Sequence, residues 1–339
     1  MTHSDLVPHL APGGKGAAST PPAILAHLGD SLKRSTSLLG LILIGTALAF
    51  TSRHFLTFDN LLNVLLQNAN IAILATGMTF VVILGEIDLS VGAVEAFGSV
   101  VAAYLMVFGH LGPVPAVAAA LLVGTFCGFF SGFFVAYFRF HSFVSTLAVM
   151  GVARGLALIP TQGASIYGLP ESFGFIGQGF IGPIAVPVIL AAAVLATAHF
   201  VLTQTAFGTH VYAVGGNPEA ARLAGINVGR VKLICLSAAG FCSALAGVIM
   251  ASRLNSGQGT IGEADILDTI AAVVIGGTSL VGGIGTIGGT VVGVLIIGII
   301  RNGLNLLGVS SFWQLVAIGL IIICAVLVDE LRRMREPNR

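Results

Sequence analysis

Long apolar runs separated by short polar stretches fill the chain from about residue 36 onward. Most are close to the roughly 20 residues that a helix needs to cross a bilayer. They are continuous rather than alternating, so they predict helices and not the strands of a membrane barrel. We therefore expect an all-α polytopic membrane protein with about ten transmembrane helices, some of them broken or re-entrant. The predicted spans are 36–52, 69–85, 91–109, 113–137, 142–160, 183–203, 232–252, 267–281, 286–306 and 311–328. The span at 267–281 is short and runs into glycines, and a re-entrant segment is the alternative there.

The composition agrees with this pattern. Hydrophobic residues make up 56% of the 339 positions and charged residues only 9%, against roughly 25% charged residues in soluble domains. The 45 glycines suit helices that pack closely inside a bilayer. A net charge of +1 gives no reason to expect a nucleic-acid partner. The cysteines lie in apolar runs without metal-binding spacing, so no metal site is predicted; they are Cys127, Cys235, Cys242 and Cys324.

Charge distribution predicts the orientation of the spans. With ten spans both termini share one side, and most of the 15 lysines and arginines fall there, whereas Arg53, Arg253 and Arg301 fall opposite. The positive-inside rule then places both termini in the cytoplasm. We predict a disordered cytoplasmic tail over 1–35, a permease domain over 36–329 with a cytoplasmic loop at 204–232, and a short tail over 330–339.

Residues 55–67 form an amphipathic stretch ahead of the second span. Asn60, Asn63 and Gln67 recur there at helical spacing among apolar residues. The pattern predicts a half-helix near the outer face, with Asp59 as its N-cap. A polar stripe that faces neighbouring helices is the alternative.

Residues 82–92 resemble residues 273–283, which suggests an internal repeat. In both segments an apolar run breaks at a glycine, Gly85 or Gly276, and polar residues follow. Broken helices in corresponding halves of a chain are typical of transport sites. The second segment therefore adds four pathway or gating candidates: Gly276, Gly277, Thr278 and Ser279.

Carboxylates gather where the second span gives way to the third. Each would cost about 2.5–3.5 kcal/mol at the bilayer centre, so they must face protein, water or the interface. Asp88 or Ser90 is a candidate cap for the helix that begins near Val91, and contact with solute or conformational gating are the alternatives. The candidates here are Gly85, Glu86, Asp88, Ser90 and Glu95.

Three further polar residues lie in or near spans. Arg154 is the only basic residue deep in a span, and its side chain either snorkels outward or serves the pathway or an acidic partner. Asn302 and Asn305 lie near the outer end of a late span. Their amides suit a hydroxyl-rich solute and suit hydrogen bonds between helices equally well.

The loop 204–232 contains a short helix with complete end signals. Asn217 is a favoured N-cap, Pro218 suits the first helical position, Glu219 complements the helix dipole, and Gly225 suits a left-handed C-terminal position. The helix has only about seven residues, and isolated helices below roughly 12–15 residues are marginal in water. It therefore needs a surface to dock on, either a partner protein or its own bundle and the membrane. The coupling candidates are Gly215, Gly216, Asn217, Pro218, Glu219, Ala220, Ala221, Arg222 and Gly225.

Motifs for catalysis are absent from the sequence. No G-x-x-x-x-G-K-[ST] loop occurs, so any nucleotide hydrolysis belongs to another chain. No nucleophile or metal motif occurs either, and we do not expect an enzyme.

Six motifs are informative together: TGMTF at 76–80, GEIDLSVG at 85–92, AVGGN at 213–217, EAARLAGI at 219–226, AAVVIGGTS at 271–279 and NGLNLLG at 302–308. With these motifs the sequence, over roughly residues 38–329, resembles the permease subunits of bacterial ABC importers for ribose and related monosaccharides. The resemblance implies a second permease copy, a cytoplasmic ATPase that binds ATP and magnesium, and a periplasmic sugar-binding protein, with no cofactor on this chain. It also identifies 219–225 with the loop by which importer permeases contact their ATPases.

Two departures from the family are visible: the Leu-Pro that often follows the coupling loop is missing, and many relatives have glycine at Glu86. We expect an inner-membrane permease that imports a monosaccharide by alternating access. One alternative is a secondary transporter or channel that uses Glu86, Asp88, Glu95 or Arg154. Another is an ABC permease for a nucleoside or a signalling sugar, since solute choice lies largely in the binding protein.

Overall fold

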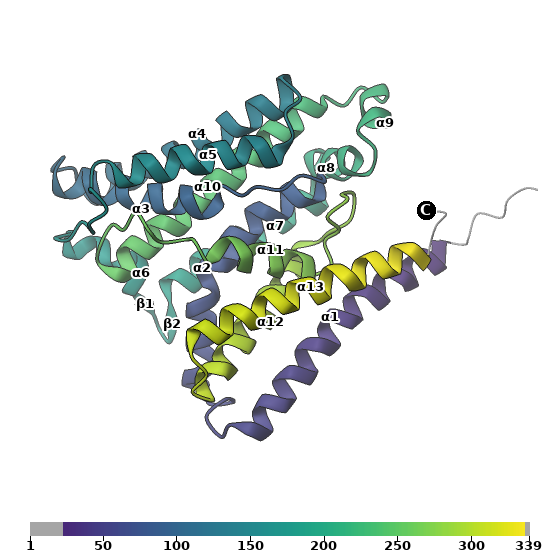
Figure 1. Cartoon of the computed structure of the whole chain (residues 1–339), viewed down its shortest axis with the longest axis horizontal. Coiled ribbons are helices and arrows are strands. Elements are labelled where there is room, and N and C mark those ends of the chain that lie inside the picture. Colours follow the sequence, from purple (N-terminus) through teal and green to yellow (C-terminus); the bar gives the residue numbers. More distant parts are fainter. Residues whose placement is uncertain (1–22, 336–339) are drawn as a thin grey trace, which may run out of the picture.

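Helices form nearly all of the regular structure in the computed structural model, which describes residues 23–335 (Figure 1). A two-stranded hairpin is the only sheet within that range. The helices are α1 (Ala23–Thr51), α2 (Phe58–Ile83), α3 (Val91–Val107), α4 (Pro113–Tyr137), α5 (Ser142–Leu158), η1 (Glu171–Phe173), α6 (Gly174–Gln178), α7 (Val186–Gln204), α8 (Ala206–Gly216), α9 (Pro218–Leu223), α10 (Val228–Leu254), α11 (Asp265–Ile275), α12 (Ile287–Leu306) and α13 (Ser311–Arg335); the strands are β1 (Phe180–Ile181) and β2 (Ile184–Ala185).

Helices α2 and α10 form the centre of the bundle. Every residue of α2 from Asn68 to Ile83 is buried, and α2 packs against α7, α10, α11 and α12. Helix α10 also packs against α3 and α4. The largest apolar cluster joins α2, α10, α11 and α12, so these helices provide the framework on which the polar groups described below are mounted.

Small residues let α4 and α10 approach closely. Gly124, Gly128 and Gly132 recur every four residues along one face of α4. A Cβ added at Gly128 would lie 2.1 Å from the carbonyl oxygen of Leu236, and one at Gly124 would lie 2.3 Å from the Ala244 Cβ. Helices in a bilayer gain little hydrophobic free energy from association, and small residues let them associate through close van der Waals packing instead.

In the part of the chain that the structure describes, five helices are long and apolar enough to cross a membrane: α2, α4, α7, α10 and α12. Shorter apolar helical stretches lie at Ser37–Thr51, Val91–Val107, Ser142–Leu158 and Ser311–Ile321. Ten crossings are therefore not confirmed and stay a prediction. The span predicted at 267–281 is wrong as a full crossing, because α11 has 11 residues and ends at Ile275, about half of the length required.

Three predicted boundaries also differ. The separate half-helix at 55–67 is wrong, because α2 runs without interruption from Phe58; its N-cap is Thr57, not Asp59, and the Thr57 hydroxyl accepts from the Asn60 amide. Helix α1 begins at Ala23, inside the tail predicted to be disordered, and α13 continues to Arg335. The remaining parts of both predicted tails, 1–22 and 336–339, lie outside the described residues.

Candidate functional site

The short helix predicted in the loop is α9, and both of its caps are confirmed. The Asn217 Oδ1 atom accepts a hydrogen bond from the Ala220 amide at 3.0 Å. Pro218 is the first residue, and the helix ends after six residues at Leu223. Gly225 follows with a φ of +85°, the left-handed conformation that favours glycine. Local sequence therefore determines where this helix starts and stops.

The outward face of α9 is charged and apolar at once. Arg222 pairs with Glu219 at 3.0 Å, and their side chains are 52% and 75% exposed. Leu223, the last residue of α9, is 91% exposed. Ala221 faces inward and joins a buried cluster with residues of α7, α8 and α10.

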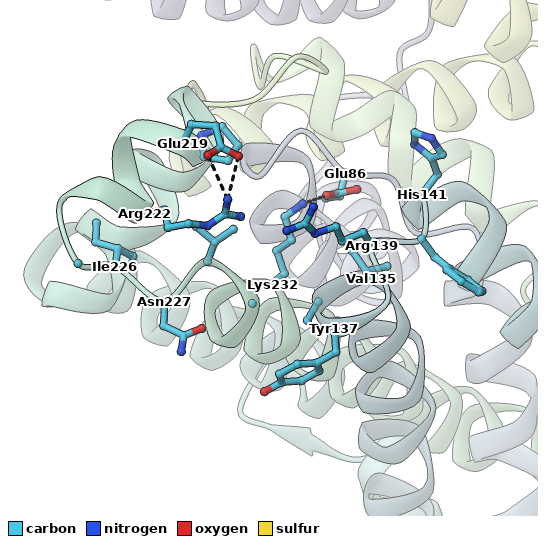
Figure 2. A pocket seen from close by; sticks show the side chains of 16 residues that line it. Glu86, Val135, Tyr137, Arg139, His141, Glu219, Arg222, Ile226, Asn227 and Lys232 are labelled. Carbon is cyan, nitrogen blue, oxygen red and sulfur yellow. Dashed lines mark hydrogen bonds and ion pairs between the residues drawn. The ribbon is translucent and has the colours of Figure 1, made fainter.

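A groove of about 840 Å³ separates α9 from the turn between α4 and α5. Figure 2 shows Glu219 and Arg222 on one side of it and Arg139 and His141 on the other. Lys232 at the start of α10 pairs with Glu86 at the base of the groove. The two acidic residues are thus neutralised by Arg222 and Lys232, which leaves Arg139 as a positive charge without an ion pair among the described residues. The groove is suited to an acidic, partly apolar partner.

Helix α8 connects α9 to the membrane-embedded part. A Cβ added at Gly215 would lie 1.8 Å from the carbonyl oxygen of Ile83, the last residue of α2. That same carbonyl accepts from the Gly283 amide at 2.8 Å. The Tyr212 hydroxyl donates to the Gly285 carbonyl at 2.8 Å. Helix α8 therefore contacts both the end of α2 and the 276–286 segment that joins α11 to α12, whereas a Cβ added at Gly216 would meet no atom within 4 Å.

The ends of α2 and α11 have the same geometry, which agrees with the similarity of their sequences. Gly85 and Gly277 have φ angles of +74° and +90°, and the amide of the next residue, Glu86 or Thr278, bonds back into the last turn. The internal repeat aligns Gly85 with Gly276, but the glycine that has the positive φ in the second segment is Gly277. The structural match is therefore shifted by one residue from the sequence match. Gly276 instead packs directly on α12, where its Cβ would lie 2.4 Å from the Gly289 carbonyl oxygen.

Asp88 and Ser90 form a local turn before α3. The Asp88 Oδ1 atom accepts from the Ser90 amide at 2.8 Å and from the Ser90 hydroxyl at 2.6 Å. Burial raises the pKa of the Asp88 carboxyl, and the hydrogen bonds from Ser90 oppose this. The Ser90 side chain makes no capping hydrogen bond to α3. Asp88 therefore orders Ser90, the residue that directly precedes the helix.

A polar network lies inside the bundle, where α2, α3 and α11 meet. Asn70 donates to the Glu95 Oε1 atom at 2.8 Å and to Asp265 at 3.4 Å. Glu95 is fully buried, and its second oxygen has no hydrogen-bond partner among the described residues. Glu95 is thus placed with two residues, Asn70 and Asp265, that the sequence analysis does not select.

One turn further along α11, Asp268 forms an ion pair with Arg301 of α12 at 2.6 Å. The Asp268 side chain is 1% exposed and that of Arg301 is 31% exposed. Removing either partner would leave a charge without compensation, so this pair fixes α11 against α12.

The Arg154 guanidinium contacts backbone carbonyls, and Arg154 forms no ion pair among the described residues. Its Nη1 atom donates to the carbonyls of Gly259 and Ile261 at 2.6 and 2.9 Å. Both belong to the irregular segment between α10 and α11. In the same segment, the backbone amide of Gln258 donates a hydrogen bond to the Ser99 hydroxyl. Non-helical backbone is tolerated within a bundle only when its polar groups are satisfied in this way.

The other predicted pathway residues tie the bundle together. Asn302 exchanges two hydrogen bonds with Asn60 at 2.9 and 2.8 Å, and Asn305 accepts from Gln314 at 2.8 Å. Both asparagines thus form the hydrogen bonds between helices that were the alternative to contact with a solute. Asn60, one of the polar residues at helical spacing in 55–67, likewise faces a neighbouring helix. Thr278 is buried without a partner for its hydroxyl among the described residues, and the Ser279 amide donates to the Ile284 carbonyl.

Several residues of these sites escape the sequence analysis. On the groove they are Arg139, Leu223 and Lys232, and inside the bundle Asn70, Asp265 and Asp268. A leucine in a short capped helix is a readable signal, as are aspartates at the start of a span. The pairing of Asp268 with Arg301 is not readable, because the two residues lie on different helices.

Comparisons with known proteins give a consistent result. Residues 60–326 match the family described as "Branched-chain amino acid transport system / permease component". The chain is similar to the ribose import permease protein RbsC of Bacillus subtilis, with 45% identity over 305 residues that cover 89% of this chain and 94% of that protein. It is 42% identical to RbsC of Haemophilus influenzae over 89% of this chain and 95% of that protein. It is 37% identical to the L-arabinose ABC transporter permease protein AraH of Azospirillum brasilense over 94% and 93%. No solved structure is significantly similar to the chain.

Proposed function

Because the chain belongs to the family of ABC transporter permeases that includes these ribose and arabinose permeases, we propose that it is the transmembrane subunit of an ATP-driven importer for a ribose-like pentose or related monosaccharide. It lies in the bacterial inner membrane with both termini in the cytoplasm. It acts beside a second permease copy, an ATPase that binds ATP and magnesium, and a periplasmic sugar-binding protein.

The observation that carries this proposal is α9. A helix of six residues is not stable in water by itself, and Ala221 docks α9 on its own bundle. Leu223 on the other side stays 91% exposed and gains free energy only when another surface covers it. The groove between α9 and Arg139 extends that surface to the turn after α4. A cytoplasmic ATPase that presents carboxylates and an apolar pocket complements both.

The contacts of α8 supply the route by which the ATPase acts on the bundle. A shift of α9 moves α8, and Gly215 and Tyr212 transmit it to the 276–286 segment. That segment is continuous with α11, which carries Asp265 of the polar network and Asp268 of the buried ion pair. The bundle has two states, which differ in the position of α11. Nucleotide binding can shift the equilibrium between them only if the ATPase binds α9 with different affinity in each state. Alternating access then follows from two positions of α11.

The first test removes the apolar contact. Leu223→Asp places a charge where the ATPase covers the helix, and we expect the ATPase to be lost from the complex during size-exclusion chromatography. Because Leu223 is exposed in the free chain, the melting temperature of the permease alone should not change. Leu307→Asp, at a leucine that is 49% exposed after α12, serves as the control and should retain the ATPase. Full retention by the Leu223 variant would contradict the docking role.

The second test separates docking from helix stability. Glu219→Lys and Arg222→Glu should each uncouple sugar uptake from ATP hydrolysis in proteoliposomes that contain the full complex. The double variant Glu219→Arg with Arg222→Glu restores the pair within α9 but reverses both charges toward the partner. We expect it to remain uncoupled. Recovery of uptake in the double variant would mean that the pair serves only α9 itself.

A second candidate function is a secondary transporter, favoured by the buried Glu95 and its neighbour Asp265. Buried carboxylates of this kind form proton relays in carriers. Such a carrier would transport solute in response to a proton gradient with no ATPase present, and a pH jump across vesicles that hold the chain alone distinguishes the two functions.

A further inference from the structure

A second cavity, of about 340 Å³, lies between α2, α10 and α12. Its α10 residues lie at the C-terminal end of that helix, whereas α9 precedes the N-terminal end, and Arg301 is its lining residue from α12. Its lining residues are Gln67, Asn68, Ile71, Met250, Arg253, Leu254 and Arg301. The volume is at the lower end of the roughly 300–1,000 Å³ typical of small-molecule sites, which suits a solute of few atoms.

The polar lining offers both donors and acceptors. The Asn68 amide nitrogen donates to the Val64 carbonyl, and the Gln67 nitrogen donates to the Asn63 oxygen. Each nitrogen keeps a second N–H, and the two amide oxygens accept no hydrogen bond from the described part of the chain. Gln67 and Asn68 therefore line the cavity with groups that accept as well as donate, whereas Arg253 and Arg301 offer only donors.

A hydroxyl both donates and accepts, so a polyhydroxylated ligand satisfies the whole lining. A phosphate or carboxylate would use the guanidinium groups and would repel the two amide oxygens. The charge of Arg301 is already balanced by Asp268. Ile71, Met250 and Leu254 complete the wall with apolar surface, which suits the C–H face of a sugar ring.

Arg301 also joins this cavity to the moving part of the bundle. Its guanidinium lines the cavity and holds the buried Asp268 of α11 at 2.6 Å. A ligand that competes for the donors of Arg301 acts on the pair that fixes α11. The cavity is therefore placed to sense solute at one end of α11 while α8 contacts the segment at the other end.

We propose that this cavity is a binding site for a neutral monosaccharide on its way through the membrane, with Gln67, Asn68 and Arg253 as its hydrogen-bonding groups and Arg301 as the link to α11. This inference rests on the proposed function.

The test uses the complete complex with its ATPase and binding protein in proteoliposomes. Gln67→Ala and Arg253→Gln should each lower the initial rate of uptake about tenfold while ATP hydrolysis stimulated by the loaded binding protein continues. Gln204→Ala, at an exposed glutamine near the end of α7, is the matched control and should transport normally. Unchanged uptake in both cavity variants would overturn the inference and leave the proposed function intact. Absence of ATP-dependent uptake by the unaltered complex would overturn both.

A binding measurement checks the ligand class without relying on transport. Gln67→Cys should react with a membrane-impermeant maleimide, with the unaltered chain as background. We expect ribose, arabinose or allose at millimolar concentration to slow this reaction at least twofold and inorganic phosphate to leave it unchanged. Protection by phosphate instead of sugar would identify an anion site, and no protection by any of the four would contradict a solute site; either result overturns the inference.

Discussion

Two arginine–carboxylate pairs in this molecule have the same chemistry and opposite surroundings. Glu219 and Arg222 meet at 3.0 Å on the exposed face of α9, with side chains 75% and 52% exposed. Asp268 and Arg301 meet at 2.6 Å inside the bundle, where the aspartate is 1% exposed. Exposed pairs contribute about 0–1 kcal/mol to stability, whereas breaking a buried pair leaves an uncompensated charge. The first pair is therefore available to a partner, and the second holds the fold.

The largest effect should come from the buried pair. Arg301→Met leaves the Asp268 carboxylate without its cation, and we expect a loss of about 3–5 kcal/mol in the free energy of unfolding. Thermal unfolding of the purified permease in detergent measures it. The double variant Asp268→Leu with Arg301→Met removes both charges and should recover most of the stability. Equal melting temperatures for the single variant and the unaltered chain would contradict a structural role for the pair.

An intermediate effect is expected where α8 meets α2. Gly215→Ala places a methyl group 1.8 Å from the Ile83 carbonyl oxygen, and overpacking of this kind costs about 1–3 kcal/mol. The same substitution at Gly216 meets nothing within 4 Å and is the control. We expect Gly215→Ala to lower both the melting temperature and the sugar transported per ATP, and Gly216→Ala to change neither. Identical behaviour of the two variants would remove α8 from the coupling route.

The smallest effect completes the comparison. Arg222→Ala breaks an exposed pair three residues apart, which contributes about 0.2–0.5 kcal/mol. The melting temperature of the permease should therefore stay nearly constant while ATPase binding weakens. A large fall in thermal stability would show that Arg222 supports the fold of α9 rather than its partner.

The same contrast explains what the sequence could predict. The start and end of α9 depend on Asn217, Pro218 and Gly225, which act on backbone groups a few residues away, so local rules are sufficient. The polar network depends on Asn70, Glu95 and Asp265, which are far apart in the chain, and the lining of the cavity likewise comes from three separate helices. No local pattern encodes those distances.

Two features of the bundle depend on where a helix ends. The apolar run from 267 continues into glycines, so the sequence leaves both a full crossing and a re-entrant segment open; in the structure Gly277 adopts a positive φ and α11 ends at Ile275. The cost of a lone charge in lipid leaves Arg154 with either an outward path or a partner inside the protein, and the non-helical segment at Gly259 and Ile261 supplies carbonyls that accept its hydrogen bonds. A broken helix creates partners that hydropathy does not reveal.

The most direct test of an ATP-driven permease compares uptake by two sets of vesicles. One set holds this chain alone under an imposed proton or sodium gradient, and the other holds it with its ATPase, the loaded binding protein and ATP. We predict sugar accumulation only in the second set. Accumulation by the chain alone, at a rate comparable to that of the complete system, would contradict the account.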